Sequence, residues 1–345
     1  MGNVVNIAAL QREAKTYEAI LQTLPFTTLM EPLTKLGIGL VDVKDKNVLV
    51  AFERKGGLTR PYAAGNPTDN PNVGEIGKVK ERELKVEKCV LPFYDNIDNY
   101  KGYTVVTGQV AADNQEKKHP LERVILEEVV KTVTEDCIDA MFHAKRDTAD
   151  LTPMGMFDGL NEMIDAEIVT GEIAAAKGNY ETTGAITLPS GTTDTDAIDK
   201  VVAFVRAGHA KLKKNATLLI DPETLYFAIK ALENKTINHS LVNFEALLNY
   251  VRSICLAPTL QIVSDECLGT GGRLILTSPG NLEFGMKTQT DKDFVQVRNP
   301  YSDPNWVQFW CQFEAGTRIR SIHAKSFIVN DQTNTAVELS GDYRS

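Results

Sequence analysis

The stretch VLVAFERKGGLTRPYAAGNPTDNPNVGEIGKVKERELKVEKCVL, residues 48–91, decides the fold that we expect. It begins with an apolar run typical of a strand, Val48–Phe52, and ends with a strand-like segment, Val79–Leu91, that carries charges of both signs. Between these runs, residues 53–78 are rich in glycine and proline, which argues against a helix or a central strand. A structureless segment of this length is uncommon inside a compact domain. The sequence therefore predicts a two-stranded arm with a Gly/Pro-rich tip.

Such an arm needs support from outside the chain. An isolated β-hairpin is only marginally stable in water, so a long projecting hairpin makes sense when another subunit holds it. The side chains that we expect to make assembly contacts lie on this hairpin and on the N-terminal helix. They are Arg54, Lys55, Arg60, Tyr62, Glu81, Arg82, Glu83, Ile7, Leu10 and Tyr17.

The N-terminal helix is predicted from one apolar stripe. Its members alternate three and four residues apart, as on one face of a helix. They are Ile7, Leu10, Ala14, Tyr17, Leu21 and Leu24. Pro25 is expected to end this helix, because an interior proline lacks the amide hydrogen that the helix needs. A narrow stripe suits an arm lying on a partner, and the alternative is a helix packed on its own domain.

A long helix and two further regions complete the chain. Pro120 at a first helical position opens a helix to about Arg146, roughly 40 Å long, which we regard as a spine. A compact α/β module follows, with helices over 197–213, 221–232 and 244–254 and a buried strand over 216–220. The end is β-rich, with strands over 274–276, 282–286 and 294–297 and a period of two at Val307, Phe309, Cys311 and Phe313.

The composition limits the classes of function. The 345 residues carry a net charge of −9, which disfavours tight nucleic-acid binding, since that relies on Lys and Arg neutralising phosphates. No apolar run approaches the length of a membrane span, and no N-terminal signal pattern is present, so we expect synthesis in a cytoplasm without membrane contact. The five cysteines form no C-x-x-C pair, which predicts reduced, structural thiols.

Motifs that carry chemistry are missing. The five histidines show no metal-ligand spacing, and neither a G-x-S-x-G elbow nor a Walker A loop occurs. Asp194-Thr195-Asp196 has a D-x-D element but lacks the glycine and late glutamate of a calcium loop, so Asp196 is expected to cap the next helix. The basic run His209–Asn215 suits a helix C-terminus. We therefore predict no catalytic, cofactor-binding or metal-binding residue, and no enzyme.

The order of these elements resembles the Hong Kong 97-type major capsid protein of tailed bacteriophages. The stretches that carry the resemblance are residues 81–99, the helix that opens at Pro120, Gly155-Met156-Phe157-Asp158-Gly159-Leu160, and Phe313-Glu314-Ala315-Gly316-Thr317-Arg318. The likeness covers roughly Val48–Val329. It implies an α+β fold with an N-terminal arm (1–47), an extended loop (48–91), a peripheral domain containing the spine helix (92–150 and 273–330), an axial α/β domain (151–272) and a tail (331–345).

The resemblance also implies a function. Such a chain self-assembles into hexamers and pentamers of an icosahedral shell, with the extended loop reaching over the neighbouring subunit. Portal, scaffolding and decoration proteins would be partners, and packaged double-stranded DNA would be contacted weakly. The chain would be made in the bacterial host cytoplasm and end in the virion capsid. Lys55 and Lys78 flank the loop tip, but no partner Asn or acid matches, so no covalent crosslink is predicted.

Two other readings remain open at the level of sequence. An encapsulin, a nanocompartment shell of the same fold, would hold a cargo enzyme in place of a genome. A soluble α/β enzyme would place its site between the two modules and form a small oligomer.

Deletion of residues 56–77 is expected to separate folding from assembly. The deleted residues supply a projecting tip and no core, so the free energy of unfolding should stay near that of the full chain while shell formation is lost. Chemical denaturation and negative-stain microscopy measure the two effects. Normal shells from the deleted chain would contradict the projecting-arm interpretation.

Overall fold

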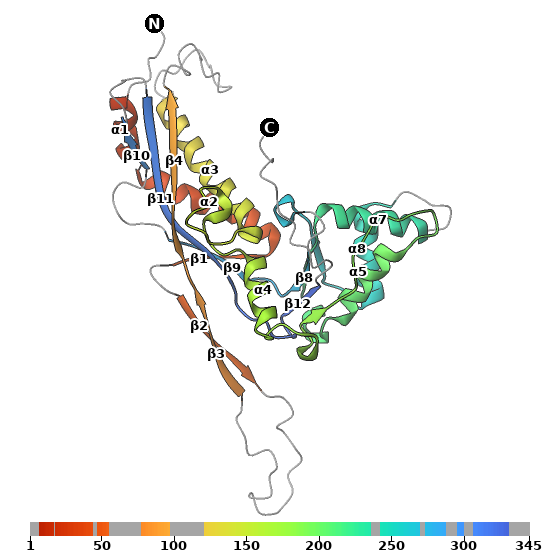
Figure 1. The fold of residues 1–345 in the computed structure, drawn as a ribbon. Coiled ribbons are helices and arrows are strands. Elements are labelled where there is room, and N and C mark those ends of the chain that lie inside the picture. Colours follow the sequence, from red (N-terminus) through yellow and green to blue (C-terminus); the bar gives the residue numbers. More distant parts are fainter. Residues whose placement is uncertain are drawn as a thin grey trace, which may run out of the picture.

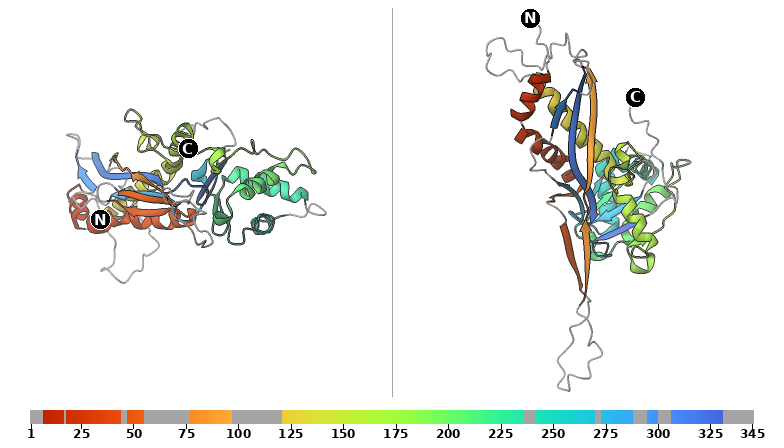
Figure 2. Two further views of the ribbon diagram at one scale, coloured as in Figure 1. Left: turned by 90° about the horizontal axis from the view of Figure 1, so that it is seen from below. Right: turned by 60° about the vertical axis from the view of Figure 1, so that its left-hand side comes forward.

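A computed structural model describes residues 7–16, 18–43, 47–54, 77–96, 121–235, 242–269, 273–287, 295–299 and 306–330. Two bodies and one projection make up this part of the chain (Figure 1). A long unit of extended strands and helices lies beside a compact α/β unit, and a two-stranded hairpin points away from both. The turned views of Figure 2 show the same projection.

Strand β11 (Trp306–Ile319) organises the sheet of the long unit. Strand β4 (Glu87–Asn96) pairs along one side of β11, and β9 (Leu282–Lys287) and β10 (Val295–Arg298) pair along the other. Strand β1 (Gly39–Asp42) adds to β9 in parallel. The predicted period of two is confirmed, because Val307, Phe309, Cys311 and Phe313 are buried while the residues between them are partly exposed. The predicted strands over 282–286 and 294–297 correspond to β9 and β10.

Three helices pack on the buried face of this sheet: α1 (Ile7–Thr16), α2 (Glu18–Leu36) and α3 (Leu121–His143). The predicted spine is confirmed as α3, which starts directly after Pro120 and ends three residues before Arg146. Its buried side chains join those of α2 and β11 in one core. Leu126, Val130, Val133 and Cys137 lie along this face of α3.

The prediction that Pro25 ends the first helix is wrong. Helix α2 continues through Pro25 and Pro32 to Leu36. Each interior proline costs a helix about 3 kcal/mol. The buried face of α2 contains four leucines, each about 1% exposed, and their burial is worth roughly 6–12 kcal/mol. Tertiary packing therefore outweighs the local penalty. The four leucines are Leu21, Leu29, Leu33 and Leu36.

The N-terminal helices belong to the body of the chain where they are described. Ala14 and Leu21, two members of the predicted stripe, are buried in the chain's own core. The Gln11 side chain donates to the Val297 carbonyl at 2.9 Å, which ties α1 to β10. The alternative of a helix packed on its own domain holds for these residues. The side chains of Ile7 and Leu10 and the whole of Tyr17 lie outside the described residues.

The α/β unit is built on a second sheet of order β5-β12-β8-β6-β7. Its strands are β5 (Tyr180–Glu181), β12 (Phe327–Asn330), β8 (Leu274–Thr277), β6 (Thr217–Leu219) and β7 (Gln261–Val263). Helices α5 (Asp196–Ala207), α7 (Pro222–Lys235) and α8 (Phe244–Cys255) pack on it. The predicted helices over 221–232 and 244–254 and the buried strand over 216–220 are therefore confirmed.

Two local predictions in this unit need correction. The helix expected over 197–213 is divided at Gly208, where ψ of 141° breaks the helix before α6 (Ala210–Lys213). A side chain at Gly208 would meet Leu276 at 2.9 Å, so the break lets the chain pass close to β8. Asp196 is the first helical residue and not the cap. Its amide instead donates to Asp194 Oδ1 at 3.1 Å.

The second sheet serves two cores at once. Alternate residues of β8 and β12 point to opposite faces, as strand geometry requires. Leu276 and Ile328 pack with the helices of the α/β unit, whereas Ile275 and Phe327 pack into the core of the long unit. Strands β8 and β12 fall within the segment 273–330 that was assigned to the peripheral domain. The predicted domain boundaries stay a prediction, but the two units share this sheet.

Residues 144–160 connect the spine to the next helix through tight turns. Gly155 lies so close to the carbonyl oxygens of Asp147 and Asp150 that a Cβ would come within 2.7 Å of each. A Cβ on Gly159 would likewise lie 2.9 Å from the carbonyl oxygen of Phe142. Helix α4 (Leu160–Val169), which the sequence analysis did not predict, starts directly after Gly159. Single turns of 3₁₀ helix occur at 153–155, 175–177 and 266–268.

The hairpin consists of β2 (Asn47–Arg54) and β3 (Gly77–Leu84), paired antiparallel from Asn47↔Leu84 to Arg54↔Gly77. Both predicted strands are confirmed, but the single strand expected over 79–91 is two, β3 and β4, interrupted at Lys85 and Val86. The loop predicted over 53–78 loses two residues at each end, because 53–54 belong to β2 and 77–78 belong to β3. Residues 55–76 lie outside the described residues.

The interruption lies where the chain crosses β11. A Cβ on Gly316 would lie 2.0 Å from the Lys85 carbonyl oxygen, so only glycine fits there. Beside this crossing, fully buried Leu84 packs against Gly285 of β9 and leaves no room for a side chain on that residue either.

Replacing Gly316 with alanine is expected to destabilise the chain strongly. The new methyl group collides with backbone, which cannot rotate away, and overpacking of this kind costs about 1–3 kcal/mol or more. Gly191 offers a matched control, since nothing lies within 4 Å of its would-be Cβ. Gly191→Ala should stay within about 0.5 kcal/mol of the original. Chemical denaturation of the unassembled chain measures the stability of both variants. Equal stability would contradict the close approach of the Lys85 carbonyl to Gly316.

Candidate assembly interface

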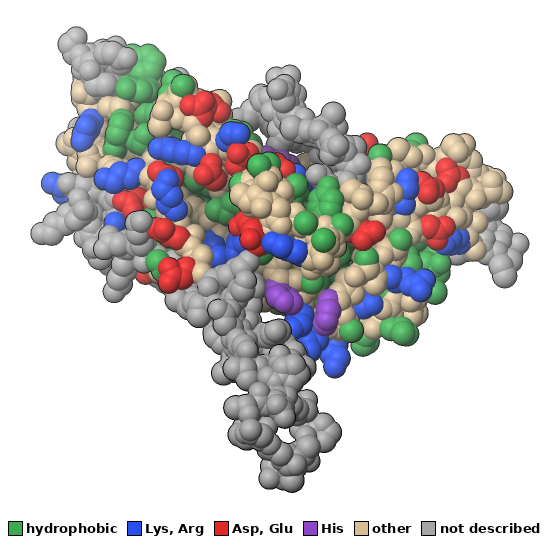
Figure 3. All heavy atoms as spheres, turned by 60° about the horizontal axis from the view of Figure 1, so that its bottom comes forward, with side chains coloured by type: hydrophobic (Ala, Val, Ile, Leu, Met, Phe, Trp, Pro, Cys, Tyr) green, Lys and Arg blue, Asp and Glu red, His purple; other side chains and the backbone are tan. Residues whose placement is uncertain are grey.

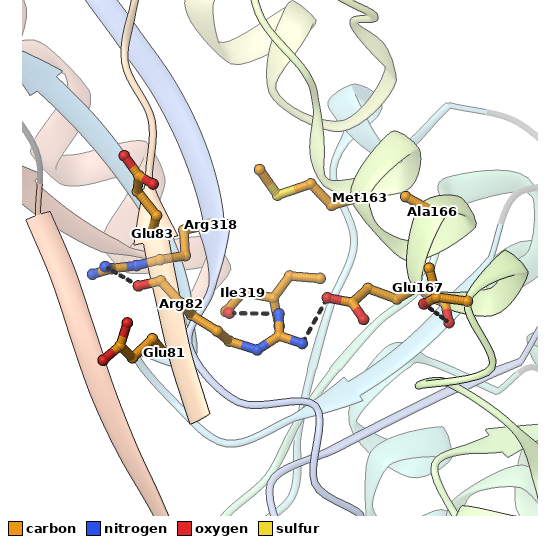
Figure 4. A pocket seen from close by; sticks show the side chains of 9 residues that line it. Glu81, Arg82, Glu83, Met163, Ala166, Glu167, Arg318 and Ile319 are labelled. Carbon is orange, nitrogen blue, oxygen red and sulfur yellow. Dashed lines mark hydrogen bonds and ion pairs between the residues drawn. The ribbon is translucent and has the colours of Figure 1, made fainter. Parts of the chain in front are cut away.

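Arg82 fastens the base of the hairpin to the body. Its Nη2 donates to Glu167 Oε1 of α4 at 2.7 Å, and its Nη1 donates to the Ile319 carbonyl at 3.3 Å (Figure 4). The two side chains of the ion pair are 17% and 25% exposed, so water screens it only in part. One arginine thus joins β3 to α4 and to the end of β11.

A second arginine continues this network into the core. Arg318 of β11 donates through Nε to Glu283 Oε2 of β9 at 2.8 Å. Its Nη1 donates to the Arg82 carbonyl at 3.4 Å (Figure 4). Arg318 and Glu283 are both buried. A buried pair of this kind holds its neighbours in one geometry, because breaking it leaves an uncompensated charge inside the protein.

Glu81 and Glu83 point away from the contact of Arg82 with Glu167 (Figure 4). They flank Arg82 on β3, and successive side chains of a strand face opposite sides, as Figure 4 shows. Both are exposed. A shallow pocket lies between the strand and α4. Its lining comprises Glu81, Arg82, Glu83, Met163, Ala166, Glu167, Thr170, Arg318 and Ile319.

The outer face of the long sheet carries exposed apolar side chains. Its members are the exposed Val90, Pro92 and Tyr94 of β4, the exposed Trp306 of β11 and the partly exposed Trp310 of β11. Val90 and Tyr94 are 43% and 46% exposed. We call these five residues the outer sheet face. In Figure 3, hydrophobic side chains gather at the end of the molecule opposite the α/β unit.

Strand β4 is also an edge. Within the described residues it pairs only with β11, along ten residues. Cross-strand contacts stiffen it. Gln308 donates to the Tyr94 hydroxyl at 3.0 Å, and the rings of Phe93 and Phe309 lie with centroids 6.2 Å apart, tilted by 33°. An exposed apolar strand at a sheet edge is a favourable place for another chain to bind.

Seven of the predicted contact residues belong to the hairpin and its tip, and their outcomes differ. Glu81 and Glu83 are exposed on the hairpin, and their contact with another subunit stays a prediction. The guanidinium of Arg82 binds its own chain, so we now expect Arg82 to position the hairpin. The backbone of Arg54 pairs with Gly77, and its side chain is not described. Lys55, Arg60 and Tyr62 lie outside the described residues.

Sequence reasoning missed the partner of Arg82. Glu167 lies on α4, which was not predicted. The apolar residues Met163 and Ile164 follow Leu160 by three and four positions, and Ile168 follows Ile164 by four, which could have indicated this helix. No sequence signal connects α4 with β3, because their contact depends on the tertiary fold.

The described residues hold no reactive thiol. All five cysteines are buried and free of disulfides, as predicted. Burial raises the pKa of the Cys89 thiol to about 11 and that of Cys311 to about 12, so both stay protonated at neutral pH. The pKa values of Cys137, Cys255 and Cys267 are raised by burial as well.

The other ionisable groups of the described residues form no metal-binding cluster. No group of three or more His, Cys, Asp or Glu side chains in the described part of the chain is arranged to hold a metal ion. Burial lowers the pKa of His143, whose Nδ1 lies 3.3 Å from the Asn161 side-chain nitrogen. Among the described helices, none combines the length and the apolar character that a membrane crossing requires.

Comparison with known proteins identifies the fold. No protein-family model and no curated protein sequence matches the chain. A chain of the satellite phage P4 procapsid, from a structure that includes the size determination (Sid) protein, aligns with a TM-score of 0.53 at 13% identity. The alignment covers 89% of this chain and 90% of that one.

A chain from the capsid of a native GTA particle aligns with a TM-score of 0.51 at 13% identity, over 87% of this chain and 95% of that one. At such low identity the likeness shows the fold alone. The chain has the α+β fold of Hong Kong 97-type capsid proteins, as its order of elements predicts.

The ion pair of Arg82 with Glu167 is expected to be coupled energetically. In a double-mutant cycle with Arg82→Ala and Glu167→Ala, the coupling should be about 1–2 kcal/mol, because the charged hydrogen bond is partly shielded. The exposed pair of Lys177 and Glu172, 46% and 39% exposed at 2.9 Å, serves as the control. Its coupling should be about 0–0.5 kcal/mol.

Chemical denaturation gives the four energies of each cycle. Limited proteolysis adds a local measurement, since loss of Arg82 should expose β2 and β3 to cleavage sooner than in the original chain. Equal coupling in the two pairs would show that Arg82 does not hold the hairpin.

Proposed function

We propose that this chain is a major capsid protein that self-assembles into an icosahedral shell enclosing a double-stranded DNA genome. The observation that carries the proposal is the hairpin: a chain with a capsid-type fold extends β2 and β3 away from its body (Figures 1 and 2). Those strands pair only with each other within the described residues. A second copy supplies the support that an isolated hairpin lacks.

Assembly into rings follows from the asymmetry of the contacts. The hairpin and the outer sheet face are different surfaces of one chain, so a contact between them is head to tail. Head-to-tail contacts close into rings when the rotation between copies allows it, which suits hexamers and pentamers. Each contact can be weak, because every subunit in a shell is held by many contacts together.

The expected contact between the chain and packaged DNA is argued from the net charge. A net charge of −9 leaves little to neutralise phosphates, so packaged DNA is contacted weakly. Portal, scaffolding and decoration proteins complete the proposed particle, which is assembled in the cytoplasm of a bacterial host. The proposal places the protein in the capsid of the virion and assigns it no catalytic activity.

An encapsulin-like shell has the same fold and differs in its contents. A folded cargo enzyme inside a small particle supports the encapsulin reading, and packaged double-stranded DNA supports the capsid reading. No described feature of the chain favours cargo enzyme over genome.

Negative-stain microscopy of the expressed full chain tests the proposal. We expect shells, sheets or capsomer rings, and in particles purified from infected cells we expect DNA that resists added nuclease. A clean monomer in solution that turns over a small substrate would overturn the shell function. Particles that contain a folded enzyme and no DNA would overturn the proposal that the shell encloses a genome.

A further inference from the structure

The tripeptide His-Ala-Lys occurs twice at one edge of the α/β unit. Its two copies are His209-Ala210-Lys211, at the start of α6, and His323-Ala324-Lys325, in the turn before β12. In each copy the histidine Nδ1 accepts a hydrogen bond from the amide of the lysine two residues on, at 3.1 Å. Two segments that are far apart in the sequence therefore form the same local turn.

The second sheet brings these two turns together. Thr217 at the start of β6 and Phe327 at the start of β12 both pair with Thr277 at the end of β8. The segments that precede β6 and β12 therefore leave the sheet at the same edge. Neighbouring strands lie about 4.8 Å apart, and β8 lies between β6 and β12, so the two segments are about 10 Å apart at the sheet.

Both segments carry positive charge into solvent. The connecting segments at this edge, 206–216, 256–260, 278–281 and 320–326, contain no Asp or Glu. In Figure 3, histidine and basic side chains gather where the α/β unit faces the hairpin. All but His323, which is partly exposed, are exposed. We call the following six residues the basic edge: His209, Lys211, Lys214, Arg320, His323 and Lys325.

The four Lys and Arg side chains of the basic edge have no ion-pair partner among the described residues. Other exposed lysines of the described chain do pair. Lys131 lies 2.6 Å from Glu128, and Lys145 lies 2.9 Å from Glu162. Lys145 belongs to a third His-Ala-Lys, at the end of the spine, so the tripeptide itself does not prevent pairing. The unpaired charge is a property of this edge of the sheet.

A helix end explains only part of this charge. Lysines near a helix C-terminus are favoured by the helix dipole, which accounts for Lys211 and Lys214 at the short helix α6. Arg320 and Lys325 lie in a turn between two strands, where no helix dipole acts on them. Their local structure therefore gives no reason for two cations beside those of α6.

The turn 320–326 is held firmly while its cations stay in solvent. The Arg320 amide donates to the Asn281 carbonyl at 2.7 Å, and Asn281 Nδ2 donates to the Ser321 carbonyl at 2.9 Å. Ser326 Oγ donates to Ser321 Oγ at 3.0 Å. Charges on a fixed backbone lose less freedom when a ligand binds, which favours binding.

We propose that the basic edge binds the phosphate backbone of double-stranded DNA. Four unpaired cations within reach of one another match a polyanion, and DNA carries one charge for about every 1.7 Å of its axis. Contacts to phosphate carry no sequence information, so the binding is independent of base sequence. The inference rests on the proposed capsid function. It adds the site through which a chain that is acidic overall contacts its packaged genome.

Fluorescence anisotropy of a short labelled duplex with the unassembled full chain measures the contact. Four neutralised phosphates predict a slope of about −3.6 for the logarithm of the binding constant against that of salt concentration. The affinity should fall about a hundredfold between about 50 and 200 mM salt. A variant with serine at four positions should bind at least about tenfold more weakly at about 50 mM salt and lose most of the slope. Its changes are Lys211→Ser, Lys214→Ser, Arg320→Ser and Lys325→Ser.

A matched variant controls for overall charge. It removes the same four charges at exposed lysines that pair with glutamates, and it should keep the affinity and the slope of the original chain. Its changes are Lys85→Ser, Lys131→Ser, Lys145→Ser and Lys230→Ser. A poly-glutamate peptide is the competing probe. Tighter binding of this peptide than of the duplex would overturn DNA as the partner.

Lysine acetylation within particles tests the contact in the shell. Lys211, Lys214 and Lys325 should react several-fold more slowly in DNA-filled shells than in shells emptied of DNA, because phosphates cover them. Lys145 should react equally in both. Mass spectrometry of the digested chains measures each lysine. Equal protection of the three basic-edge lysines in filled and emptied shells would show that another copy covers them, and the inference fails.

The outcomes separate this inference from the function on which it rests. If shells form and package DNA but the two serine variants bind the duplex alike, the basic edge is overturned and the capsid function stands. If the original chain forms no shells while only the basic-edge variant loses DNA binding, the capsid function fails and the DNA site stands.

Discussion

One contact between two backbone segments sets the geometry of the long unit. The chain leaves β3, passes over β11 at Gly316 and enters β4, with the Lys85 carbonyl so close that no side chain fits beneath it. This crossing makes two strands out of one extended segment. β4 completes the sheet, and β3 leaves it at an angle as part of the hairpin (Figure 1). The direction of the projection is therefore decided in the core, by a glycine that is distant in sequence from the hairpin.

The network around this crossing explains how a long projection can have a firm base. Leu84 supplies apolar packing, Arg82 reaches to α4, and the buried pair of Arg318 and Glu283 fixes β11 to β9 beneath them. Ion pairs in such places add little net stability, because removing the charges from water costs about as much as their attraction returns. These ion pairs instead fix the orientation of the segments that they connect. A hydrogen-bonded guanidinium has one arrangement, whereas an apolar contact tolerates several.

The sequence is sufficient to predict an element where its periodic pattern extends over many residues. The spine, the alternation along β11 and the hairpin strands follow from spacing alone, and their order was enough to predict the capsid fold. It was insufficient where tertiary contacts outweigh local rules, as at Pro25, where buried leucines carry the helix past a residue that should stop it. It also could not show that Arg82 meets Glu167, that two His-Ala-Lys turns lie at one edge of a sheet, or that β8 and β12 join the α/β sheet. Each depends on segments that only the folded chain brings together.

The burial of every cysteine has a practical consequence. All five native thiols are inside the protein, and burial raises their pKa values further above neutral pH than that of an ordinary thiol. The surface thus has no native thiolate to compete with a maleimide or to form disulfides between copies in an oxidising buffer. A single cysteine introduced on the surface would be the one labelling position on each copy. The native chain is a ready background for attaching fluorophores or spin labels, with none of its own cysteines removed.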